Sequence, residues 1–79
     1  MARPSLPVRL GKVIRERREA LGVSQEAFAD RLGVHRTYYG AVERGKQNLT
    51  LASIERIAKA LEVPVSSLFV SADKLGKVD

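Results

Sequence analysis

The fold of this chain is decided by residues 24–45, which read SQEAFADRLGVHRTYYGAVERG. Apolar residues recur there at helical spacing in two short stretches, and Leu32-Gly33-Val34 separates them. Gly33 can adopt the left-handed conformation that ends a helix, and Ser24 offers a hydroxyl that can cap the start of one. The segment therefore predicts two short helices joined by a tight turn, with the small Ala29 where they cross.

Outside this segment, the sequence predicts three more helices. A first helix, stopped by Gly22, has one inward stripe, made of Leu10, Ile14, Arg17 and Leu21. Thr50 caps a fourth helix, whose inward positions are Leu51, Ile54, Ile57, Ala58 and Leu61. Pro64 suits the first turn of a short fifth helix that ends at Leu68-Phe69. Strand patterns are nearly absent, so the predicted fold class is all-α, a compact five-helix bundle.

The length and composition of the chain limit its organisation. Seventy-nine residues predict a single domain over 1–79, with a core at about 8–70 and flexible ends at 1–6 and 71–79. The absence of cysteine argues against disulfide frameworks, thiolate zinc sites and iron–sulfur clusters. The longest apolar run is Leu68-Phe69-Val70, so we expect no membrane span and no secretory signal, and a cytoplasmic protein.

The charge of the chain is unevenly distributed. The net charge is +5, but residues 1–50 carry ten basic and five acidic side chains, whereas residues 51–79 carry four of each. This excess favours a polyanionic partner, nucleic acid, for the first fifty residues. Aromatic residues are few (Phe28, Tyr38, Tyr39 and Phe69). Platforms that bind single strands stack bases on several aromatic rings, so this class is disfavoured.

Catalysis is not expected from this sequence. His35 is the only histidine, and no cluster of titratable residues accompanies it, so the sequence predicts neither an enzyme nor a metal site. No cofactor or small-molecule ligand is expected either. His35 itself is interpreted as a turn residue or helix cap that can touch a phosphate.

The helix pair at residues 24–45 fits a helix-turn-helix, which can lay its second helix in the major groove of DNA. Together with Val42-Glu43-Arg44-Gly45-Lys46 and Val63-Pro64, the pair resembles the phage-repressor-like (Cro/CI-type, Xre) family of DNA-binding domains. The resemblance runs from about Leu10 to Phe69 and implies a lambda-repressor-like fold with double-stranded DNA as partner. Arg36-Thr37-Tyr38 with Asn48-Leu49-Thr50 is similar to controller proteins of restriction–modification systems, which implies an autoregulatory role.

The docking of such a helix pair suggests which residues meet DNA. Arg36, near the start of the second helix, is expected to read guanine, and Thr37 to touch a thymine methyl group or a phosphate. The resemblance implies that Gln25 anchors the DNA backbone. The predicted DNA-binding residues are Gln25, His35, Arg36, Thr37, Tyr38, Arg44, Lys46, Gln47 and Asn48.

Two further sets of residues are assigned structural roles. Arg17 lies on the apolar stripe of the first helix, which is costly unless its charge is paired. The resemblance implies that Arg17 forms a partly buried ion pair with Glu43, whereas Arg15 and Arg18 are expected on a solvated basic face. One recognition helix reads few base pairs, so we expect a homodimer on an inverted repeat. The predicted dimer interface is Val65, Leu68 and Phe69.

The predicted function is therefore sequence-specific regulation of transcription. Two alternatives stay open at this point: an antitoxin-like protein-interaction module with DNA-binding autoregulation, and a non-specific basic nucleic-acid binder. The ratio of affinities for specific and random DNA separates the last of these from the first.

Overall fold

The computed structural model describes residues 3–76, which form five α-helices and no strand. Their bounds are α1 Leu6–Ala20, α2 Gln25–Leu32, α3 Arg36–Glu43, α4 Leu51–Leu61 and α5 Val65–Leu75. The predicted all-α fold class and the predicted number of helices are confirmed. Residues 1, 2 and 77–79 of the predicted flexible ends lie outside the described residues.

Local interactions begin and end these helices where the sequence predicts. The Ser24 hydroxyl accepts a hydrogen bond from the Ala27 amide at the start of α2, and Thr50 accepts one from Ser53 at the start of α4. Gly33 ends α2 at φ 71°, a backbone conformation that residues with a Cβ adopt only at a cost. These caps satisfy backbone groups that the helices leave unpaired, so the turn between α2 and α3 is fixed locally.

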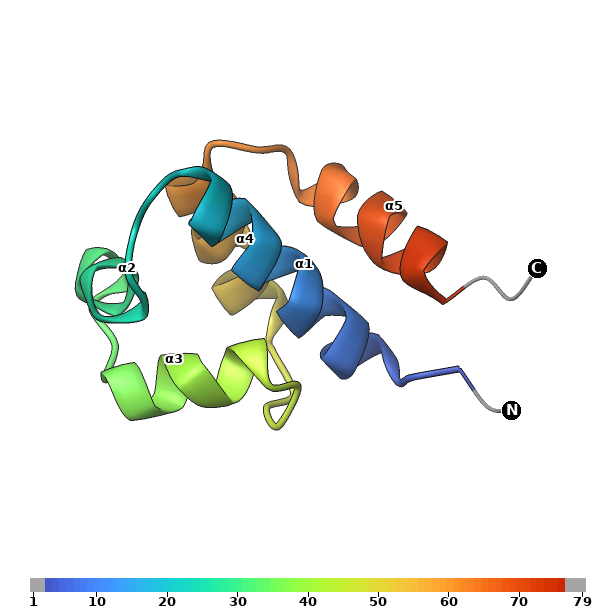
Figure 1. Ribbon diagram of the computed structural model, residues 1–79, viewed down its shortest axis with the longest axis horizontal. Helices are drawn as coiled ribbons and strands as arrows, with labels where there is room; N and C mark the ends of the chain where they lie inside the picture. Colours follow the sequence, from blue (N-terminus) through green and yellow to red (C-terminus); the bar gives the residue numbers. More distant parts are fainter. Residues whose placement is uncertain (1–2, 77–79) are drawn as a thin grey trace.

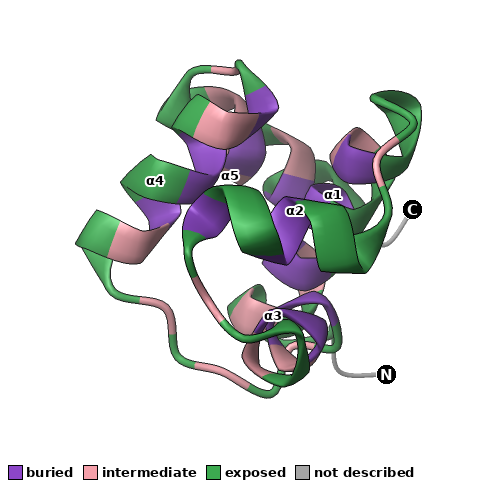
Figure 2. Ribbon diagram, turned by 90° about the vertical axis from the view of Figure 1, so that its left-hand side faces the viewer, coloured by how far each residue is buried: buried purple, intermediate pink, exposed green. Residues whose placement is uncertain are grey.

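Helix α1 lies at the centre of the bundle. Helix α5 runs along one side of it, and α2 and α3 lie on the other side (Figure 1). Figure 2 shows buried residues on the sides of α1, α2 and α4 that face inward, with exposed residues outside. Four of the five helices (α1, α2, α3 and α5) supply the largest fully buried side chains, which are Tyr39, Phe28, Ile14, Leu68 and Val42. This core fixes the position of α3 relative to α1 and α2.

Three sequence expectations about the second half of the chain are wrong. Leu51 was expected inward but its surface is 83% exposed, because it is the first residue of α4 and the buried stripe starts one turn later, at Ile54. Helix α5 does not end at Phe69 but continues to Leu75, because Ala72 packs fully buried within the core. Leu68 was predicted at the dimer interface, but it is fully buried. It therefore closes the core of the monomer and has no surface to offer a partner.

Candidate nucleic-acid interface

Helix α3 is held by α2 on one side and presents polar side chains on the other. The rings of Phe28 and Tyr39 meet with centroids 5.2 Å apart, which packs α2 against α3. The Nδ1 atom of His35 accepts a hydrogen bond from the Thr37 amide at 3.0 Å, so the side chain of His35 caps α3. Arg36 and Thr37 follow directly and are exposed. The first turn of α3 is therefore fixed in place while the side chains of Arg36 and Thr37 remain exposed at the surface.

A hollow of about 470 Å³ lies between the start of α2 and the outer face of α3. Its lining residues are Ser24, Gln25, Glu26, Arg36, Thr37, Gly40 and Arg44. Four of the predicted DNA-binding residues (Gln25, Arg36, Thr37 and Arg44) thus come together on one surface, although they lie on two helices and the turn after the second. Such a polar, basic hollow suits the backbone and base edges of DNA.

Gly40 forms part of the floor of this hollow. It is buried, and a Cβ atom added there would meet Arg44 Nη1 at 3.2 Å and Gln25 Oε1 at 3.9 Å. The side chains of Arg44 and Gln25 therefore lie over the glycine. The absence of a side chain at position 40 deepens the hollow rather than exposing bare helix.

The remaining predicted residues lie apart from this hollow. Lys46 is exposed in the loop after α3. Gln47 and Asn48 line a separate, mostly apolar hollow of about 260 Å³, together with Leu6, Pro7, Leu10, Leu49, Leu51, Ile54 and Phe69. The hollow between α2 and α3 thus gathers the residues expected to read bases. Lys46, Gln47 and Asn48 lie outside it, and their predicted contacts with DNA stay predictions.

A buried ionic network stands directly behind the hollow. Arg18 donates from Nε to Glu43 Oε2 at 2.6 Å and from Nη2 to Glu43 Oε1 at 3.1 Å. The two side chains are only 9% and 2% exposed. Gln25 Nε2 donates to the same carboxylate at 2.8 Å, which ties the start of α2 to the end of α3. Both halves of the helix pair are thereby fixed to α1.

The partner of Glu43 is therefore Arg18, and the expected Arg17–Glu43 pair is wrong. Gly11 explains the difference, because an added Cβ there would lie 2.5 Å from the Val42 carbonyl oxygen. Helix α3 thus crosses α1 in close contact at Gly11, and Arg18 lies two turns along the same face. Arg17 points elsewhere and donates to the Ser71 hydroxyl on α5 at 3.3 Å. Arg18 likewise does not belong to the expected solvated face.

Glu43 keeps its charge in spite of its burial. Burial disfavours the carboxylate, but the hydrogen bonds from Arg18 and Gln25, with the neighbouring Tyr39 hydroxyl, outweigh it and lower the pKa of Glu43. Burial, together with the nearby Glu43 carboxylate, raises the pKa of Tyr39, whose buried hydroxyl lies outside hydrogen-bond geometry. The network is a structural ion pair that positions α3.

Comparison with known proteins agrees with this geometry. The sequence profile of helix-turn-helix proteins matches residues 14–68, a span that contains α2, α3 and the whole ionic network. The chain belongs to the Xre-type helix-turn-helix family. The predicted family resemblance is confirmed.

Several relatives of this Xre-type chain are controller proteins. Control protein C.MunI of a Mycoplasma species is 36% identical over 70 residues, covering 87% of this chain and 95% of that protein. The structure of the restriction–modification controller protein C.AhdI from Aeromonas hydrophila has 44% identity and a TM-score of 0.75, covering 78% of this chain and 94% of that one. The controller protein C.Esp1396I, solved as a tetramer in complex with its natural 35 base-pair operator, has 35% identity and a TM-score of 0.79, covering 91% and 95%.

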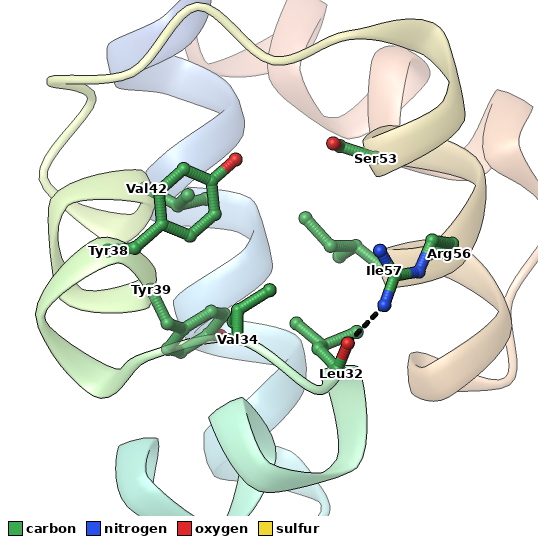
Figure 3. A pocket seen from close by; sticks show the side chains of 8 residues that line it. All are labelled: Leu32, Val34, Tyr38, Tyr39, Val42, Ser53, Arg56 and Ile57. Atoms are coloured by element: carbon green, nitrogen blue, oxygen red, sulfur yellow. Dashed lines mark hydrogen bonds between the residues drawn. The ribbon is translucent and has the colours of Figure 1, made fainter.

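One residue that holds the Xre-type motif was not found from the sequence. Arg56 on α4 donates from Nη2 to the carbonyl oxygen of Leu32, at the turn between α2 and α3 (Figure 3). The side chain of Tyr38 lies in the same region, on the side of α3 that faces α4, and both residues line a hollow of about 90 Å³. An arginine on the polar face of a helix carries no signal that it caps another helix, so only the packing reveals it.

Two further observations concern the described residues. In residues 3–76, no helix is both long enough and apolar enough to span a membrane. Over the same range, no three histidine or acidic side chains gather closely enough to hold a metal ion.

Proposed function

We propose that this chain is a sequence-specific double-stranded DNA-binding regulator of transcription, acting as a homodimer on an inverted-repeat operator. The observation that carries the proposal is the hollow between α2 and α3, which gathers Gln25, Arg36, Thr37 and Arg44 around a firmly anchored recognition helix. A helix held in this way can enter the major groove with its first turn at the base edges. The operator complex of the similar C.Esp1396I supports the same assignment.

The role that fits best is that of an autoregulatory controller of a restriction–modification system. The chain is similar to the control protein C.MunI and to the restriction–modification controller protein C.AhdI over most of their length, which supports this role. A regulator of this kind binds DNA and has no enzymatic role. We expect it in the cytoplasm, where its DNA target lies. Its concentration and its dimerisation would set how much of the operator it occupies.

The dimer interface is expected around the apolar hollow lined by Leu6, Leu51 and Phe69. Among residues 3–76, Leu51 is the most exposed of the large apolar residues, and Leu6 adds exposed apolar surface beside it. Val65 lies one turn before Phe69 on α5 and remains part of the proposed surface. A second copy that covers this surface removes it from water, and residues 51–79 carry no net charge to oppose the contact.

Two measurements test these proposals. Footprinting on the DNA upstream of the chain's own gene should show two protected half-sites about one helical turn, roughly 34 Å, apart. Sedimentation at micromolar concentration should show a dimer, which Leu51→Asp dissociates and Glu55→Gln, an exposed change on the same helix, does not. If the chain remains monomeric and protects one undivided half-site, the proposed dimer is wrong. If footprinting shows uniform protection along the DNA, the proposed sequence-specific regulator is wrong.

A further inference from the structure

One acidic side chain lines the hollow that the proposed function assigns to DNA. Glu26, in the first turn of α2, places Oε2 3.8 Å from Nη1 of Arg36, the first residue of α3. Both side chains are about 70% exposed, at 71% and 70%. The other charged residue of this hollow is Arg44. A carboxylate therefore stands on the surface where the phosphates of DNA are expected.

This placement is unfavourable for DNA binding as such. A carboxylate close to phosphates repels them, and it lowers the affinity for every sequence unless the protein gains something else. A helix N-terminus does favour an acidic side chain, by about 0.3–1 kcal/mol. That role, however, requires no contact with Arg36, and it would leave the preference between DNA sequences unchanged. The contact with Arg36 points to a second role.

We propose that Glu26 is a specificity-determining residue that acts through Arg36. A guanidinium group has five N–H donors, so Arg36 can keep one edge on Glu26 and present another to the O6 and N7 atoms of a guanine. On random DNA, the competing partner for Arg36 is a phosphate. To reach it, Arg36 must leave Glu26, and an unpaired carboxylate then faces the DNA backbone. Glu26 thus penalises the wrong complex more than the right one.

The proposal rests on the proposed DNA-binding function and predicts a difference between two affinities. Glu26→Gln keeps the size of the side chain and removes its charge. We expect the affinity for a random duplex to rise about tenfold and the affinity for the operator to rise only about twofold, so the specificity ratio falls about fivefold. The salt dependence on random DNA should steepen by about one unit, because Arg36 is free to neutralise one more phosphate.

Asp30 provides a matched control. It lies one turn further along α2, is exposed, and forms no ion pair within residues 3–76. Asp30→Asn removes the same charge from the same helix, so it should raise both affinities by the same small factor. The double variant Glu26→Gln/Arg36→Ala provides a second control, since the effect of Glu26 on the ratio should vanish when Arg36 is absent.

The experiment is a competition between the operator and a random duplex of equal length, at several salt concentrations, with circular dichroism confirming that each variant is folded. The inference is overturned if Glu26→Gln and Asp30→Asn change both affinities alike. It is also overturned if Glu26→Gln lowers the ratio equally with and without Arg36, because Glu26 would then act on DNA by itself. If the wild-type chain does not prefer its operator, the proposed function fails first and this inference fails with it.

Discussion

Removing Arg18 should expose how much the buried ion pair stabilises the fold. In the variant Arg18→Met, the apolar stem remains but Glu43 loses two hydrogen bonds, at 2.6 and 3.1 Å. Its carboxylate is only 2% exposed, so water cannot replace the lost partner. Breaking such a pair from one side costs about 3–5 kcal/mol. We expect about 3 kcal/mol, since Gln25 still donates to the carboxylate.

That loss is large for a chain of this size. A domain of 79 residues has a free energy of unfolding of about 4–12 kcal/mol. Each kcal/mol shifts the melting temperature of such a domain by about 4–8 °C, so Arg18→Met should melt at least about 12 °C earlier. Replacing both partners, in Arg18→Met/Glu43→Leu, leaves no unpaired buried charge and should recover most of the loss.

Urea unfolding followed by circular dichroism, at one fixed protein concentration, measures these differences. Arg17→Met is the matched control, because Arg17 neighbours Arg18 but, within residues 3–76, its side chain donates only to the Ser71 hydroxyl. It should lose less than about 0.5 kcal/mol. The reasoning is refuted if Arg17→Met destabilises as much as Arg18→Met, or if the double variant loses the sum of its two single losses.

Three other predictions test the site and its support. Because the pKa of Glu43 is lowered in the folded chain, its ion pair should stabilise the fold fully above the ordinary carboxyl pKa of about 4.3. This stabilisation should be lost as the pH falls through the lowered pKa. A difference in the free energy of unfolding between wild type and Glu43→Gln that persists unchanged at pH 2 contradicts this. Gly11→Ala should destabilise by about 1–3 kcal/mol, because its Cβ would meet backbone oxygen at 2.5 Å. Gly40→Ala should not destabilise, because its Cβ would meet only side-chain ends, Arg44 at 3.2 Å and Gln25 at 3.9 Å; thermal melts check both variants. In binding assays, Arg36→Ala should lose the preference for one or two base pairs and Lys46→Ala should weaken all sequences alike; equal losses in both variants would contradict these roles.

The local features of the fold could be predicted from the sequence because their causes are local. A hydroxyl at Ser24 or Thr50 and a glycine at position 33 act within one turn of the chain. The helix pair that they delimit follows from the same rules, and so does the exposure of Arg36 and Thr37 at its second helix. The exposed surface of α3 that we propose faces DNA was therefore largely predictable as a surface.

The errors concern how helices meet. The stripe of α1 predicts an inward face, but the angle at which α3 crosses it decides whether Arg17 or Arg18 reaches Glu43. That angle depends on the close contact at Gly11, which the sequence shows only as one glycine inside a helix. Leu51 likewise has the right spacing for the α4 stripe, but it lies outside the core with 83% of its surface exposed. Such features arise from tertiary packing.

The ratio of the affinities for the operator and for random DNA, measured at one salt concentration, tests the central claim most directly. If α3 reads base edges from the hollow it forms with α2, the wild-type chain should bind its operator at least about 10³ times more tightly than a random duplex. Arg36→Ala should lower that ratio by about tenfold or more, in keeping with the loss of one bidentate contact to guanine. Equal affinities for the two duplexes would contradict the claim and leave only a basic surface that binds any DNA.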